Sequence, residues 1–151
     1  MLGSSHQQGF ENTLPIGASC LSLLRSNVDC PKCRSELIEV EYAGVTVDRC
    51  EACAGIWFDA LELDALLRAK GAETIDSGNA QLGKQHNTND RIKCPRCTTQ
   101  MLRMVDPGQP HIWFEQCSAC GGSFFDAGEF RDLKQHTISD FFKRLFAKPR
   151  M

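Results

Sequence analysis

Eight of the nine cysteines fall into four pairs, each with two residues between its members. A CxxC turn presents two thiolates along one edge of a tetrahedron, so two such turns can enclose one metal ion. A four-thiolate site is closed and leaves no open position for water or substrate, which predicts a structural site and not a hydrolytic one. The pairs are Cys30 and Cys33, Cys50 and Cys53, Cys94 and Cys97, and Cys117 and Cys120.

The cysteine pairs belong to a tandem repeat. Placing Cys94 over Cys30, and Cys117 over Cys50, aligns CPKC with CPRC and CEACAGIWFDALEL with CSACGGSFFDAGEF. Each copy therefore carries a full set of four ligands. We expect each copy to bind its own ion, so that pairing within a copy is preferred over pairing between copies. The ninth cysteine, Cys20, is expected to be a free thiol.

Each copy is only about forty-five residues long, near the size below which a core alone seldom supports a fold. Zinc is the preferred ion, because a closed four-cysteine site is its usual structural pattern. A rubredoxin-type iron centre uses the same ligands and stays open as an alternative. A thioredoxin-like redox centre needs a helix that begins at the motif, whereas residues 35–42 and 98–105 have an extended pattern, which disfavours that hypothesis.

A β-hairpin is expected between the two cysteine pairs of each copy. In the first copy, Ile38, Val40 and Tyr42 alternate with Leu37, Glu39 and Glu41, before a turn at Ala43-Gly44. In the second copy, residues 101–105 and 111–116 flank a loop with Pro-Gly turn chemistry.

A short helix is expected after the second cysteine pair of each copy. Asp59 is placed to cap the first helix together with Glu62, and Asp126 and Glu129 repeat this arrangement. The aromatic residues that precede these caps are predicted to be core or staple residues and not contacts for a partner. They are Trp57, Phe58, Phe124 and Phe125.

These motifs resemble the bacterial zinc-ribbon family named after the TFIIB-type transcription-factor zinc finger, whose hallmark is CPxC followed by CxxCxGxWFDxGEL. The resemblance covers roughly residues 28–67 and 92–134. It implies a small metal-stabilised α+β fold of two tandem zinc ribbons, with one zinc ion on the four cysteines of each copy, and it implies no particular biochemical role. Leu61 replaces the family's glycine and Phe124 its tryptophan, and neither position is a ligand.

The stretch between the copies is rich in Gly, Asn, Gln, Ser and Thr, has no aromatic residue, and predicts a flexible linker. The copies would then behave as beads on a string, and replacing Cys50 with Ser would unfold the first copy alone. The predicted parts are a disordered N-terminal extension (1–27), zinc ribbon 1 (28–71), the linker (72–91), zinc ribbon 2 (92–136) and a basic aromatic C-terminal tail or helix (137–151).

Charge separates the classes of partner. The formal net charge is −2. Residues 28–69 hold four basic and nine acidic side chains, and residues 94–136 hold four basic and five acidic ones, so neither ribbon is predicted to have the clustered cations that bind phosphate. The tail could lie on nucleic acid or on an anionic membrane, or its phenylalanines could pack on the second ribbon. It combines Lys143, Arg144, Lys148 and Arg150 with Phe141, Phe142, Leu145 and Phe146. In Trp113-Phe114, the member that faces solvent is a candidate contact.

These observations predict a cytoplasmic, non-enzymatic, zinc-binding module that binds a protein partner. No nucleophile, carboxylate pair or phosphate loop stands out, and no small-molecule substrate is inferred. No run approaches the ~20 apolar residues of a membrane span, and the first residues lack the basic start of a secretory signal. The alternatives are a transcription-associated nucleic-acid binder and a rubredoxin-like iron electron carrier.

Overall fold

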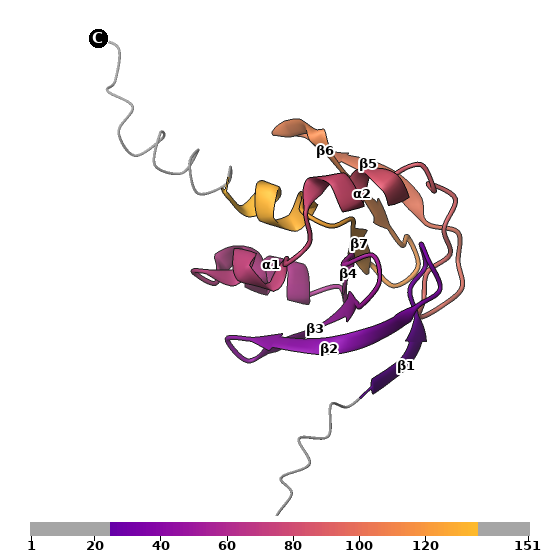
Figure 1. Cartoon of the computed structure of the whole chain (residues 1–151), viewed down its shortest axis with the longest axis horizontal. Coiled ribbons are helices and arrows are strands. Elements are labelled where there is room, and N and C mark those ends of the chain that lie inside the picture. The colour runs from indigo at the N-terminus through magenta and orange to yellow at the C-terminus, as the bar shows by residue number, and fades with distance from the viewer. Residues whose placement is uncertain (1–24, 136–151) are drawn as a thin grey trace, which may run out of the picture.

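The computed structural model describes residues 25–135, which form a seven-stranded antiparallel sheet and several short helices (Figure 1). The strands are β1 (Arg25–Asp29), β2 (Glu36–Tyr42), β3 (Val45–Cys50), β4 (Ile56–Phe58), β5 (Leu102–Asp106), β6 (Gln109–Gln116) and β7 (Ser123–Phe125). The helices are α1 (Glu62–Arg68), the 3-10 helix η1 (Ala72–Ile75), α2 (Ala80–His86) and one over residues 129–135. Within this part of the chain, no helix has the length and apolar character needed to cross a membrane.

The predicted N-terminal extension and C-terminal tail lie largely outside the described residues. Residues 1–24 and the basic tail 137–151 lie outside the described residues. Residues 25–27, predicted to belong to a disordered extension, are instead part of β1, which pairs with the outer side of β2.

Both predicted hairpins are confirmed. The strands β2 and β3 pair from Leu37 with Cys50 to Tyr42 with Val45, so the turn is Ala43-Gly44. Both turn residues have positive φ, 52° and 79°, which matches the type I′ turn that suits the twist of a hairpin. In the second copy β5 and β6 pair similarly around a two-residue turn at Pro107-Gly108, and the register shifts between Val105 and Asp106, which leaves residues 110–112 of β6 as a bulge.

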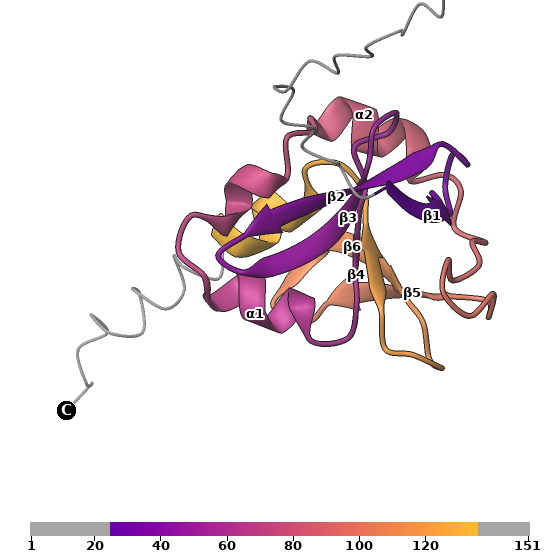
Figure 2. The ribbon, with the colours of Figure 1, turned by 90° about the horizontal axis from the view of Figure 1, so that it is seen from below.

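The short third strands, β4 and β7, join the two copies into one sheet. The strand order is β1-β2-β3-β4-β7-β6-β5, and Trp57 lies directly opposite Phe124. These two residues hold the same position in the repeat, so the copies are related by an approximate two-fold axis through this pair. Figure 1 shows the two hairpins on opposite sides of the β4 and β7 pair, and Figure 2 shows the same ribbon from below. The copies are therefore not beads on a string.

Reciprocal packing of an aromatic ring on a glycine seals this junction. Trp57 and Phe124 are both fully buried, as predicted for core residues. A Cβ atom at Gly122 would lie 2.2 Å from Cζ2 of Trp57, and a Cβ atom at Gly55 would lie 2.4 Å from Cζ of Phe124. Each ring thus occupies the space that a side chain on the other copy would fill, which explains why small residues stand at both positions.

Replacing Gly122 with Ala is expected to destabilise the whole described fold by about 1–3 kcal/mol, because the methyl group would overlap the Trp57 ring and force the core to move. Chemical denaturation of the metal-loaded protein measures this change. Gly108→Ala is the matched control, since a Cβ there meets only the Asp106 side chain at 3.3 Å. Equal stability of the two variants would contradict the packing described for the junction.

Residues 72–91 do not form the predicted flexible linker, because they contain η1, which contacts β2 of the first copy, and α2, which packs on the second copy. A Cβ atom at Gly83 would lie 2.3 Å from the carbonyl oxygen of Ala127, and one at Gly78 would lie 2.4 Å from the Ala127 side chain. Small residues here allow close packing, and composition alone cannot distinguish that use from flexibility.

The connection also completes the second helix. The carboxylate of Asp76 is buried and accepts from the backbone N–H groups of Gly128 (2.9 Å) and Arg131 (3.0 Å), which is the role of a helix cap. The helix over residues 129–135 in turn supports α1, since Nζ of Lys134 donates to the carbonyl oxygen of Leu67 at 3.0 Å. The two copies and their connection therefore share hydrogen bonds as well as a sheet.

The predicted aspartate caps are wrong. The helix α1 begins at Glu62, and its N-terminus has no side-chain cap. The Asp59 carboxylate instead accepts from Nε1 of Trp57 at 2.9 Å, and the Asp126 carboxylate accepts from Lys32 at 3.0 Å. One half of the predicted capping box is present, because Oε2 of Glu62 accepts from the backbone N–H of Asp59 at 2.7 Å.

Candidate metal centres

All four cysteine pairs adopt the same backbone turn. In each turn the N–H of the first cysteine donates to the carbonyl five residues later at 2.8 Å, and its own carbonyl accepts from the N–H four residues later at 2.9 to 3.1 Å. The residue after the second cysteine of each turn has a left-handed backbone, and this residue is glycine in only one of the four turns. These residues are Arg34, Ala54, Thr98 and Gly121, with φ of 63°, 56°, 58° and 75°.

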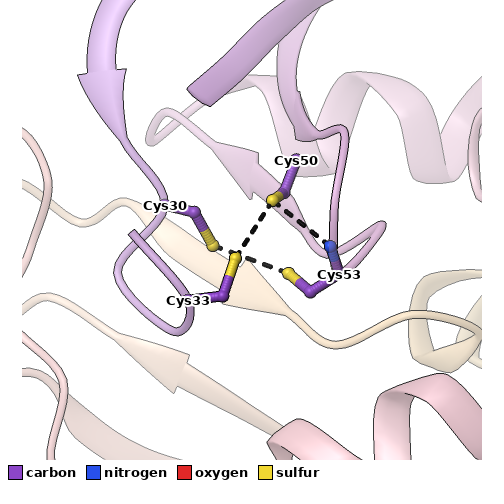
Figure 3. A group of neighbouring side chains, drawn as sticks. All are labelled: Cys30, Cys33, Cys50 and Cys53. Carbon is purple, nitrogen blue, oxygen red and sulfur yellow. Dashed lines mark hydrogen bonds between the residues drawn. The ribbon is translucent and has the colours of Figure 1, made fainter. Parts of the chain in front are cut away.

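The first metal centre lies between the turn before β2 and the turn after β3 (Figure 3). Sγ of Cys30 is 3.6 Å from Sγ of Cys53, and Sγ of Cys33 is 3.4 Å from Sγ of Cys50. A tetrahedral zinc site with bonds of about 2.3 Å has sulfur atoms about 3.8 Å apart, so these side chains fit such an ion closely. The backbone N–H of Cys53 points at Sγ of Cys50 at 3.4 Å, which offsets thiolate charge.

The second metal centre repeats the first but is more open. Sγ of Cys94 is 3.6 Å from Sγ of Cys120, and Sγ of Cys97 is 3.3 Å from Sγ of Cys117. Cys94 and Cys117 are buried, whereas Cys97 and Cys120 are exposed. The structure thus brings together all eight predicted ligands in two separate groups, and each group comes from a single copy.

Thiols this close compete for protons. Hydrogen bonding with Cys50 raises the pKa of Cys30 far above its ordinary value, and the same contact lowers the pKa of Cys50. In the second centre burial raises the pKa of Cys94 to about 12, whereas the contact with Thr99 lowers the pKa of Cys97 to about 6. Four thiolates cannot share such a space without a cation, and a divalent ion meets this need because it binds deprotonated sulfur.

Each CPxC turn also sends a cation into the other copy. Nζ of Lys32, in the first copy, lies 2.8 Å from Oε1 of Glu115 and 3.0 Å from Oδ2 of Asp126 in the second copy. The equivalent residue of the second copy, Arg96, lies 2.6 Å from Oδ2 of Asp48 and 3.3 Å from Oδ2 of Asp59 in the first copy. These reciprocal ion pairs tie each metal-binding turn to the strand and helix start of its neighbour.

The two bridges differ in burial. The Lys32 side chain is fully buried, whereas the Arg96 side chain is 36% exposed. Burial raises the pKa of both Glu115 and Asp126, although the Lys32 ammonium opposes this effect. Loss of the Lys32 bridge would therefore leave the buried carboxylates of Glu115 and Asp126 without a counter-charge.

Glu129 adds a third carboxylate to the buried group formed by Lys32, Glu115 and Asp126. Its Oε2 atom is buried and has no hydrogen-bond partner among residues 25–135. Burial raises the pKa of Glu129 to about 8, and the negative charges of Asp126 and Glu115 add to this shift. The folded chain therefore holds a proton on Glu129 at neutral pH.

This proton makes stability depend on pH. Between pH ~4.5 and pH ~8 the folded state keeps the Glu129 proton and the unfolded state does not, so the free energy of unfolding falls as pH rises, by at most about 1.4 kcal/mol per pH unit from this group. Glu129→Gln is expected to flatten the fall measured by denaturation between pH 6 and pH 8.5. Glu39→Gln, on an exposed residue, is the control, and parallel profiles for wild type and Glu129→Gln would contradict the assignment.

The sequence predicted that one residue of Trp113-Phe114 faces solvent, and this residue is Trp113. Trp113 is 37% exposed, with the Arg103 guanidinium 4.7 Å from its ring centroid. Phe114 stacks on Phe125 at a centroid distance of 4.9 Å and belongs to the core.

The ion pairs made by the cations between the paired cysteines were not predicted from the sequence. Lys32 and Arg96 occupy the same position of the two CPxC motifs, and Asp48 and Glu115 both stand two residues before the next cysteine pair. A cation and a carboxylate at equivalent positions of both copies indicate an ion pair, but only the two-fold arrangement shows that each pair joins one copy to the other.

Comparison with known proteins gives one family. A family model described as "Transcription factor zinc-finger" matches residues 29–69 and 93–136, the two copies of the repeat. No curated protein and no solved structure matches the chain.

Proposed function

Because the chain belongs to the transcription factor zinc-finger family of zinc ribbons, with two complete four-cysteine sites, we propose that it holds one zinc ion in each site and acts as a non-enzymatic module that binds another protein. The eight cysteines would hold the two ions, which supply structural crosslinks and no chemistry at an open position. Cysteines must stay reduced to bind zinc, and the cytoplasm is a reducing compartment, so we propose that the protein is cytoplasmic.

Zinc is favoured over iron because a closed four-cysteine site is its usual structural pattern and because the chain belongs to a zinc-ribbon family. Both metals accept four thiolates, so metal analysis must separate them. Protein purified from its own host is expected to be colourless and to contain two zinc ions per chain. A coloured protein with iron and a reversible reduction would support the electron carrier and would overturn the zinc assignment.

A protein partner is favoured over nucleic acid because residues 25–135 hold more acidic than basic side chains. Lys32 and Arg96 are used inside the molecule, and the β2 strand exposes the carboxylates of Glu39 and Glu41. Nucleic-acid affinity rests on many contacts between phosphates and Lys or Arg side chains, and an acidic surface opposes them. A rigid, metal-supported body with an uneven distribution of charge is suited to selective contact with another protein.

The experiment is recovery of stoichiometric partners with the tagged, metal-loaded full chain, followed by direct binding of the purified candidates. We expect a protein partner that resists nuclease treatment and is lost with the Cys117→Ser variant, which cannot complete the second site. Recovery of nucleic acid that depends on Lys143, Arg144, Lys148 and Arg150, with affinity falling steeply with salt, would instead support the nucleic-acid alternative.

A further inference from the structure

A depression of about 500 Å³ lies where the two CPxC turns approach each other. Cys30 and Cys94 line it from the two metal centres, and Pro31, Pro95 and Ile92 provide apolar surface. The first cysteine pair of each copy thus contributes one wall, on either side of the approximate two-fold axis. We refer to this depression as the knuckle groove.

Three exposed cations surround the knuckle groove. Arg34, Arg91 and Lys93 all line it, against a single lining carboxylate on Asp29. None of the three charged groups has an ion-pair partner among residues 25–135, whereas Lys32, which also lines the groove, is neutralised by Glu115 and Asp126. An acidic protein therefore carries a local concentration of unpaired positive charge beside an apolar floor.

We propose that the knuckle groove binds an acidic peptide segment of the partner protein, with carboxylates against Arg34, Arg91 and Lys93 and an apolar side chain on the two prolines. This inference rests on the proposed function, because it names the chemistry of the protein partner. Charge complementarity carries it: opposite charges across an interface direct encounter and suppress unsuitable partners.

The occupant is a separate molecule and not an undescribed end of this chain. Residues 1–24 contain one acidic residue, Glu11, and residues 136–151 contain only Asp140 among four basic residues. Neither end offers the run of carboxylates that three unpaired cations would attract.

A short peptide fits the groove better than a nucleic acid. Three cations can meet the carboxylates of a few residues, whereas a polynucleotide would extend past the groove over a surface on which acidic residues outnumber basic ones. The apolar floor formed by Pro31 and Pro95 also suits a side chain of a peptide and not a phosphate backbone.

The test uses the metal-loaded full chain and three labelled probes: a ten-residue peptide of alternating Glu and Leu, its counterpart with Gln in place of Glu, and a ten-nucleotide single-stranded DNA. The groove variant is Arg34→Gln, Arg91→Gln and Lys93→Gln together. The matched control is Arg68→Gln, Lys70→Gln and Lys84→Gln, which removes three exposed cations elsewhere. Metal content and circular dichroism of each variant are measured alongside binding.

The acidic peptide is expected to bind the wild type and the control alike, to bind the groove variant roughly tenfold more weakly, and to outcompete both other probes. Equal losses in both variants, preferential binding of the DNA, or no binding of the acidic peptide would overturn the inference. A fall in metal content with unchanged peptide affinity of the loaded fraction would assign the cations to the metal centres instead.

The two proposals fail in different ways. If the partner recovered with the full chain binds the groove variant as well as the wild type, the groove inference is wrong while the proposed function stands. If no protein partner is recovered at all, the proposed function is wrong whatever the peptide does. Self-association of the wild type that the groove variant abolishes would identify the occupant as the acidic face of a second copy and overturn the inference of a separate partner protein.

Discussion

Replacing Cys50 with Ser is expected to unfold both copies of the repeat, not the first alone. The substitution removes a ligand at the end of β3, just before the turn that leads into β4. The strand β4 pairs with β7 of the second copy and places Trp57 on Gly122, so its loss removes half of the shared core. A structural zinc ion contributes about 10–16 kcal/mol in small zinc domains, which matches or exceeds the 5–15 kcal/mol stability of a typical fold.

Amide NMR spectra and metal content measure this outcome together. In Cys50→Ser we expect signal dispersion to collapse for residues of both copies, and metal content to fall below one ion per chain. Cys20→Ser is the control, since Cys20 lies outside all four pairs, and it should keep two ions and the wild-type spectrum. A variant that keeps one ion and a dispersed spectrum for residues 93–135 would show that the second copy folds independently.

Replacing Lys32 with Ala is expected to cost about 3–5 kcal/mol, because it leaves the buried carboxylates of Glu115 and Asp126 without their cation. The repeat supplies its own control in Arg96→Ala, which removes the equivalent bridge to Asp48 and Asp59. In that bridge Arg96 and Asp59 are partly exposed and only Asp48 is buried, so water can reach most of it once the guanidinium is removed, and the cost should be smaller, about 1–2 kcal/mol.

Denaturation of both metal-loaded variants at one pH gives the comparison. Metal content is checked for each, because both residues lie inside a CPxC turn. The difference in free energy of unfolding between the two variants is the informative quantity. Equal costs, or a larger cost for Arg96→Ala, would contradict the role assigned to burial at the Lys32 bridge.

Much of the local structure could be predicted from spacing and periodicity. The four CxxC turns place their sulfur atoms in two groups of four, the alternation before Ala43-Gly44 produces the β2 and β3 hairpin, and Trp57 and Phe124 are buried. These features depend on neighbours close in sequence, or on ligands that one ion must collect. Local chemistry is sufficient to specify them.

The relation between the copies could not be predicted in the same way. The three-residue strands β4 and β7 are too short to show a pattern, and their extended structure depends on pairing with the hairpin of their own copy and with each other. Asp59 and Asp126 have the spacing of helix caps, but their carboxylates instead bind cations that are distant in sequence, Arg96 and Lys32 respectively. A polar, glycine-rich stretch gave no sign that Asp76 would cap the second helix.

Stepwise removal of metal from the unaltered chain, followed by amide NMR, tests most directly whether the two copies form one metal-dependent unit. With half of the metal withdrawn by a chelator, we expect only two sets of signals, one from the fully folded chain and one from the unfolded chain. A third set, with one copy dispersed and the other collapsed, would contradict a shared folding unit. A spectrum unchanged after complete metal removal would contradict its dependence on metal.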